Sequence, residues 1–81
     1  MKYIVGDMGH LGLTTAILFH EGIEHLAFKE RFGHICSAGF CKLHFDANGQ
    51  AVVHAYGESI GLGVVSNPER DEKIIKRLIN G

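Results

Sequence analysis

The sequence predicts an α+β domain, with a mainly antiparallel sheet and two helices packed on it. Two alternating runs flank Asn48-Gly49, and this dipeptide is the strongest short signal for a β-hairpin. The C-terminal stretch "PERDEKIIKRLING" has the apolar spacing and the end signals of an amphipathic helix. The chain has 81 residues, so one domain covering residues 1–81 is expected.

The first quarter of the chain contains one clear strand and one ambiguous element. Lys2 to Met8, "KYIVGDM", is rich in β-branched and aromatic residues and is expected to be a strand. "GHLG", at residues 9–12, is expected to be a turn that carries His10. "LTTAILF", from Leu13 to Phe19, suits a buried strand, and a helix that begins at Thr14 is the alternative.

A helix is expected from Gly22 to Gly33, because Gly33 suits a left-handed C-terminal cap. The residues expected to share its apolar face are Ile23, Leu26 and Ala27. Phe28 and Phe32 lie on a different side, so this helix is expected to be buried on two faces.

The hairpin pattern also predicts which side chains share a face. If Asn48-Gly49 is a two-residue loop, one face carries Cys41, Leu43 and Phe45 together with Val52, His54 and Tyr56. The other face carries Lys42, His44 and Asp46. We therefore expect His44 to face solvent and His54 to lie on the mostly apolar face.

The last helix has signals at both ends. Asn67 is a suitable N-cap, and Pro68 occupies the first helical position. Glu69, Asp71 and Glu72 favour the positive end of the helix dipole, and Lys76 and Arg77 the negative end. The expected buried stripe consists of Ile74, Ile75, Leu78 and Ile79.

Composition argues against several classes of partner. Eight basic and nine acidic residues give a net charge of −1, without the basic stripe that a nucleic-acid partner requires. No apolar run approaches the roughly 20 residues that span a bilayer. No secretory signal is recognisable, so a cytoplasmic protein is expected. The small core favours homodimerisation, because a second copy would add buried apolar surface.

The stretch "HEGIEH", His20 to His25, superficially resembles a zinc-protease helix. Zinc-protease histidines are four residues apart, whereas these are five apart and would lie about 140° around a helix. They therefore cannot share one metal. His20 sits at the junction of two elements, where a histidine can act as a general base or simply cap a helix. His25, like His10 and His34, is expected to be a surface or turn histidine.

The two cysteines, Cys36 and Cys41, have a spacing that is neither a redox pair nor a standard zinc motif. Reduced, partly buried thiols are expected in a cytoplasmic chain. A zinc site that combines both with a histidine brought in by folding is the alternative.

The glycine-rich stretch "YGESIGLG" lies between an expected strand and an expected helix. Glycines allow successive backbone N–H groups to turn inward and form a nest for an anion, and Ser59 adds a hydroxyl donor. The spacing is neither the dinucleotide fingerprint nor a P-loop. The stretch is either a phosphate or carboxylate site or an ordinary connection.

The run "VVHAYGESIGLG" resembles the core signature of the Janus/Ocnus family, the phosphohistidine phosphatases, in which a strand ending His-x-Tyr-Gly-x-Ser leads into a loop and a helix. "MKYIV", "ILFHEGIEH" and "GHICSAGFCKLHF" resemble that family's first strand, its histidine segment and its glycine-rich segment, in the same order. The resemblance spans nearly the whole chain and implies a phosphohistidine-phosphatase-like fold. The hairpin motif is its specific part.

Carried over by position, the resemblance implies His20 as the general base that activates water, and Lys2 as a substrate contact. The residues implied to bind the phosphoryl group are Ser59, Ile60 and Gly61, together with Gly39. The family's arginine after the glycines is absent here, and Lys42 stands one position late. Alternation along the strand places Lys42 on the face opposite Cys41, so Lys42 does not replace the arginine as a phosphate clamp. The resemblance therefore implies the activity less directly than it implies the fold.

Three functions fit the sequence. The first is a small phosphatase-like enzyme that hydrolyses phosphohistidine or another phosphoramidate without a metal or other cofactor. The second is a non-catalytic module that binds a phosphorylated protein or a small phosphorylated molecule through the same loop. The third is a metal-binding or structural protein.

Overall fold

The computed structural model describes residues 1–8 and 12–81 and contains a four-stranded antiparallel sheet in the order β2-β1-β3-β4. These strands are β1 (Lys2–Asp7), β2 (Thr14–Phe19), β3 (His34–Phe45) and β4 (Ala51–Tyr56). The remaining elements are the 3-10 helix η2 (His25–Arg31), the short strands β5 (Glu58–Ser59) and β6 (Val64–Val65), and helix α1 (Pro68–Asn80). The α+β class and the antiparallel sheet are confirmed.

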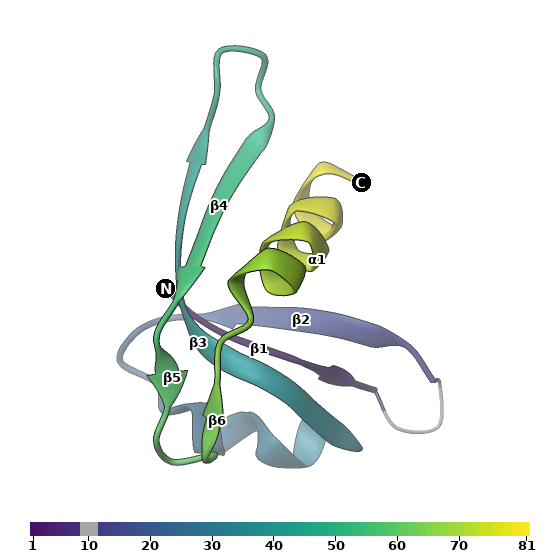
Figure 1. Ribbon diagram of the computed structural model, residues 1–81, viewed down its shortest axis with the longest axis vertical. Coiled ribbons are helices and arrows are strands. Elements are labelled where there is room, and N and C mark those ends of the chain that lie inside the picture. The colour runs from purple at the N-terminus through teal and green to yellow at the C-terminus, as the bar shows by residue number, and fades with distance from the viewer. Residues whose placement is uncertain (9–11) are drawn as a thin grey trace.

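The sheet is covered on both faces, and alternation along the strands divides the core in two. Tyr3 and Val5 of β1 pack with Ile75 of α1. Ile4 points the other way and packs with Phe32, which follows η2. In Figure 1, α1 and the fainter η2 lie on opposite sides of strands β1, β2 and β3, with α1 above them and η2 below.

The ambiguous segment before residue 20 is a strand. Thr14 to Phe19 pairs with the whole of β1, from Lys2 opposite Phe19 to Asp7 opposite Thr14. Its β-branched residues suit a pleated surface that is partly buried on both sides. Of the turn expected at residues 9–12, the structure describes only Gly12; His10 lies outside the described residues.

The helix predicted from Gly22 to Gly33 forms only from His25 to Arg31, and it is a 3-10 helix. Its predicted apolar face is wrong, since Leu26 is 49% exposed whereas His25 and Phe32 are buried. A 3-10 helix has three residues per turn instead of 3.6, so the side chains that face the sheet are no longer those of an α-helix. Gly33 is not a helix cap, because its N–H donates to the carbonyl of Asp7.

The β3–β4 hairpin has a register one residue away from the predicted one. The N–H of Asp46 donates to the carbonyl of Gln50, and Gly49 has a φ of 77°. The loop is therefore a three-residue turn with a left-handed glycine, and the shift by one residue exchanges the two faces of β4. The buried residues of β4 are Ala51, Val53 and Ala55. His54 is exposed, contrary to the prediction.

The glycine-rich stretch after the hairpin also has regular structure. β5 pairs antiparallel with β6, with Ser59 opposite Val64. Gly63 donates to the carbonyls of Ser59 and Ile60 and closes the turn between the two strands. The sequence had indicated only a loop here, because strands of two residues carry no periodic signal.

Helix α1 follows its sequence signals closely. The side chain of Asn67 accepts the N–H of Arg70, and Pro68 stands at the first helical position. Ile75 is fully buried, but Leu78, which was expected in the buried stripe, is exposed. Within the described residues, neither helix is long and apolar enough to cross a bilayer.

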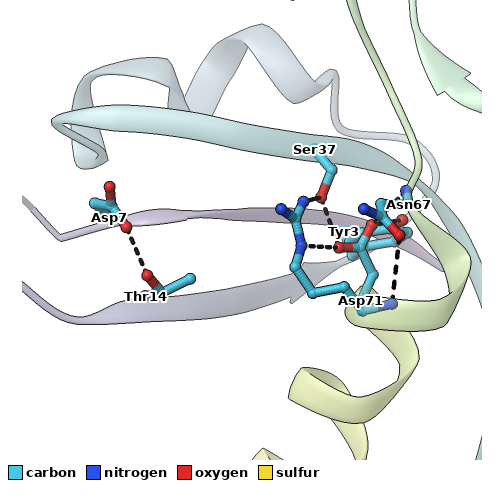
Figure 2. Close-up of polar contacts among 7 residues, drawn as sticks. Tyr3, Asp7, Thr14, Ser37, Asn67 and Asp71 are labelled. Carbon is cyan, nitrogen blue, oxygen red and sulfur yellow. Dashed lines mark hydrogen bonds and ion pairs between the residues drawn. The ribbon is translucent and has the colours of Figure 1, made fainter.

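A buried polar cluster fixes the start of α1 to the sheet (Figure 2). The carboxylate of Asp71 is fully buried and accepts hydrogen bonds from the hydroxyls of Tyr3 and Ser37 and from the N–H of Asn67. The guanidinium of Arg70 donates to both Asp71 and Ser37. Each oxygen of the Asp71 carboxylate therefore accepts two hydrogen bonds, which is the condition for burying a carboxylate without a large penalty.

Candidate functional site

A surface pocket of about 450 Å³ lies between the start of β1, the segment around η2 and the turn after β4. Its lining consists of Lys2, Glu24, His25, Leu26, Phe40 and the continuous stretch Gly57 to Gly61. The pocket thus brings together Lys2, Ser59, Ile60 and Gly61, four of the residues that the resemblance implies for phosphate binding. His20 and Gly39 are not part of the lining.

Lys2 is held at the edge of this pocket by two contacts. Its ammonium Nζ donates to the carbonyl of Ile23 at 2.9 Å. The same atom lies 6.0 Å from the ring centroid of Phe40, within the range of a cation–π contact. These contacts restrain the ammonium group while leaving two of its three hydrogens for a ligand.

The turn from Ser59 to Gly63 presents backbone donors. Ser59 is 3% exposed, and its Oγ accepts the N–H of Leu62 at 3.3 Å. Among the described residues, the amides of Ile60 and Gly61 have no hydrogen-bond partner, and Ile60 is 88% exposed. Two adjacent free N–H groups at a turn are the elements of an anion-binding nest.

His25 is the buried titratable side chain of this pocket. Its Nε2 lies 2.8 Å from the carbonyl oxygen of Gly39, and the rings of Phe19 and Phe40 contact it edge-on. Because a carbonyl only accepts, Nε2 must carry a hydrogen, and a neutral ring then has its lone pair on Nδ1.

The second ring nitrogen of His25 is left without a partner. The side chain lines the pocket although it is only 6% exposed. Among the described residues, Nδ1 has no hydrogen-bond partner, whereas Nε2 is held by Gly39. The ring is therefore fixed in orientation at the wall of the pocket.

His20 lies outside this pocket. Its Nδ1 accepts the N–H of Gly22 at 2.9 Å, and it borders a separate hollow together with Met1, Leu18, Phe19 and Glu21. The side chain caps the turn that follows β2, and not the start of a helix as the structural alternative had it, because η2 begins only at His25. The structure does not bring His20 into the lining with Ser59, Ile60 and Gly61.

Gly39 is linked to the pocket only indirectly, because its carbonyl accepts the hydrogen bond from His25, which lines the pocket. A Cβ atom at this position would lie 2.4 Å from the carbonyl oxygen of Tyr56, so the glycine permits a close approach of two backbones. Lys42 lies outside the pocket, with its Nζ 5.9 Å from the ring centroid of Tyr56. The chain therefore supplies no second cation where the family's arginine would be.

The charges around the pocket are mixed. Of its described lining residues, Lys2 is cationic, whereas Glu24 and Glu58 are anionic. The net charge of the lining does not favour an anion. Any affinity for phosphate must therefore come from the oriented amides and the local position of Lys2.

Among the residues that the structure describes, the two cysteines are not grouped with other metal-ligating side chains. Both are free, and burial raises the pKa of the Cys41 thiol, which packs against α1. In the described portion of the chain, no three His, Cys, Asp or Glu side chains are grouped as metal ligands would be.

Comparisons with family models, curated proteins and solved structures gave no match to this chain. His25 was expected to be a surface or turn histidine, and this prediction is wrong, because the side chain is buried at the start of η2. Its burial depends on the 3-10 geometry of η2 and on the position of β3, and neither has a local sequence signal.

Proposed function

We propose that this chain is a binding module for the phosphoryl group of a phosphorylated protein or small molecule. The observation that carries the proposal is that Lys2, Ser59, Ile60 and Gly61 line one pocket, and that the amides of Ile60 and Gly61 have no hydrogen-bond partner among the described residues. Backbone donors fixed by a turn need little reorganisation when they bind an oxyanion.

Binding without turnover is favoured over catalysis for two reasons. His20, the residue expected to act as the general base, is occupied in a cap outside the pocket. The position expected to hold a clamping arginine is Cys41, which is buried against α1. A ligand in this pocket would therefore meet donors but no bidentate clamp.

The test is a ¹H–¹⁵N NMR titration with inorganic phosphate at low salt. We expect saturable shifts of the amides from Ser59 to Gly63, and weaker binding by Lys2→Gln. The matched control is Lys73→Gln, since Lys73 is exposed on α1 and is not among the lining residues. Shifts spread evenly over the surface, or equal affinities of the two variants, would reject the proposal.

Hydrolysis of phosphohistidine or another phosphoramidate is the second candidate, and the position of His25 favours it. In this reaction, water attacks phosphorus and a histidine accepts one proton of the water. The P–N bond breaks with its electron pair on nitrogen, and the released nitrogen takes up that proton. His25 lines the pocket and its Nδ1 has no hydrogen-bond partner among the described residues, so Nδ1 is the candidate acceptor, and no metal would be needed. Together with this function we propose that the fold is of the phosphohistidine-phosphatase type and that the protein is cytoplasmic.

Turnover separates the two candidates. Phosphohistidine would be incubated with wild type, His20→Ala and His25→Gln, since Gln keeps a donor for the Gly39 carbonyl but removes the basic Nδ1. Hydrolysis that is lost only in His25→Gln supports the enzyme with His25 as its base, and loss only in His20→Ala supports the role implied by the resemblance. If the wild type binds phosphate but does not hydrolyse phosphohistidine, the result supports the binding module and rejects the enzyme.

A further inference from the structure

We infer that the solvent-facing side of the β3–β4 hairpin is a docking surface for an acidic peptide segment next to the phosphorylated group. This inference rests on the proposed function, because the phosphoryl group itself would occupy the pocket. We call this surface the hairpin outer face. Its residues are Phe40, Lys42, His44, Val52, His54 and Tyr56.

The observed register creates this face. Phe40 stands opposite Tyr56, and Lys42 stands opposite His54. Helix α1 packs on the other side of the hairpin, and η2 and β5–β6 cover only the part of the sheet nearer β1. In Figure 1 the hairpin projects beyond the remaining strands. Lys42, His44 and His54 are accordingly exposed.

The hairpin outer face is continuous with the pocket. Phe40 lines the pocket and stacks on Tyr56, with 5.8 Å between the ring centroids and an interplanar angle of 23°. Gly57, the residue after Tyr56, is also part of the lining. A chain that leaves the pocket along β4 therefore passes directly over Tyr56, which is 44% exposed.

The polar groups of this face are complementary to carboxylates. Lys42 is cationic and lies over Tyr56, and His44 and His54 stack with 6.1 Å between their ring centroids. None of the six residues is acidic. The neighbouring carboxylate of Asp46 is engaged within the turn, where it accepts the N–H groups of Asn48 and Gln50.

The charge pattern favours a peptide over a nucleic acid. The backbone of a nucleic acid carries one negative charge per nucleotide, and Glu24 and Glu58 in the lining of the pocket would repel it. A peptide with a single phosphate can place its acidic side chains selectively on Lys42 and the two histidines. The whole chain has a net charge of −1, which gives no long-range attraction for a polyanion.

The length of the face sets the footprint of the peptide. From Phe40 to His44 the strand advances by four residues, or about 13 Å at 3.3 Å per residue. An extended peptide covers that distance with about four residues. The acidic positions are therefore expected within about four residues of the phosphorylated one.

The experiment uses two synthetic nonapeptides with a central phosphoserine. In the first, Glu residues flank the phosphoserine on both sides, and in the matched peptide Gln replaces each Glu. Binding is followed by NMR and calorimetry on the full chain. We expect the Glu peptide to bind about fivefold more tightly, as one or two exposed charge pairs would produce. Lys42→Gln should remove this advantage, whereas Lys76→Gln, on α1, should keep it.

The outcomes separate the two proposals. Equal affinities of the Glu and Gln peptides, with shifts retained from Ser59 to Gly63, overturn the docking surface and leave the phosphate pocket intact. Absence of pocket shifts with any phosphorylated ligand overturns the proposed function instead. A single-stranded oligonucleotide that binds the hairpin outer face more tightly than the Glu peptide overturns the assignment of the partner.

Discussion

At the scale of single residues, burial changes the chemistry of Tyr3 most clearly. Its pKa is raised above the ordinary value, first by desolvation and then by its hydrogen bond to the Asp71 carboxylate and the charge of that group. The folded state therefore keeps the phenol proton at a pH where the unfolded chain releases it. A raised pKa means that stability is fully present below the unfolded value, about 10, and declines as the pH rises above it.

Tyr3→Phe tests this linkage. At pH 7 the substitution should lower the free energy of unfolding by about 1–2 kcal/mol, because Asp71 loses one buried donor. Above pH 10 the difference between wild type and Tyr3→Phe should shrink, because only wild type loses stability by ionisation of this phenol. Urea unfolding at pH 7 and at pH 10.5 measures both differences. Tyr56→Phe is the control, since Tyr56 is partly exposed and is expected to show neither effect.

At the scale of elements, the turn of the β3–β4 hairpin decides which side chains reach solvent. The carboxylate of Asp46 binds two turn amides, and Gly49 occupies the left-handed region. This three-residue loop keeps His54 outside and Val53 inside. The hairpin outer face exists only in this register, because a slip of one residue would turn Val52, His54 and Tyr56 to the other side of β4.

Gly49→Ala should therefore destabilise the protein by about 1 kcal/mol. A Cβ atom at Gly49 meets no neighbour within 4 Å, so the cost arises from its φ of 77° and not from a clash. Gly61→Ala is the control, because Gly61 does not have a positive φ. Thermal or urea unfolding of the two variants measures the difference. Equal stabilities would contradict the assigned turn.

At the scale of the whole molecule, Asp71 connects β1, β3 and the start of α1. Its partners Tyr3, Ser37 and Asn67 are far from one another in the sequence but meet at one carboxylate (Figure 2). The arrangement sets the position of α1 on the sheet. It acts in addition to the apolar contacts around Ile75, which do not specify one position of the helix as sharply.

Asp71→Ala should lower the free energy of unfolding by about 3–5 kcal/mol, because it leaves several buried donors without an acceptor. Domains of this size have a total stability on the order of 5–10 kcal/mol, so this variant is expected to be partly unfolded. Ser37→Ala should stay folded and lose about 1 kcal/mol. Glu69→Ala, on the exposed side of the same helical turn, should change little. A loss below 1 kcal/mol for Asp71→Ala, measured by urea unfolding, would refute the anchoring role.

The sequence by itself determined the α+β class, the limits of α1 and the position of the β3–β4 hairpin. Asn67, Pro68 and Asn48-Gly49 act on backbone groups within a few residues, so their effect can be read locally. The register of the hairpin, the buried face of η2 and the separation of His20 from the pocket were decided only by the tertiary structure. They depend on how the strands pair and on which side chains the sheet can cover. For the same reason His25, which has no local signal, became the histidine of the candidate site.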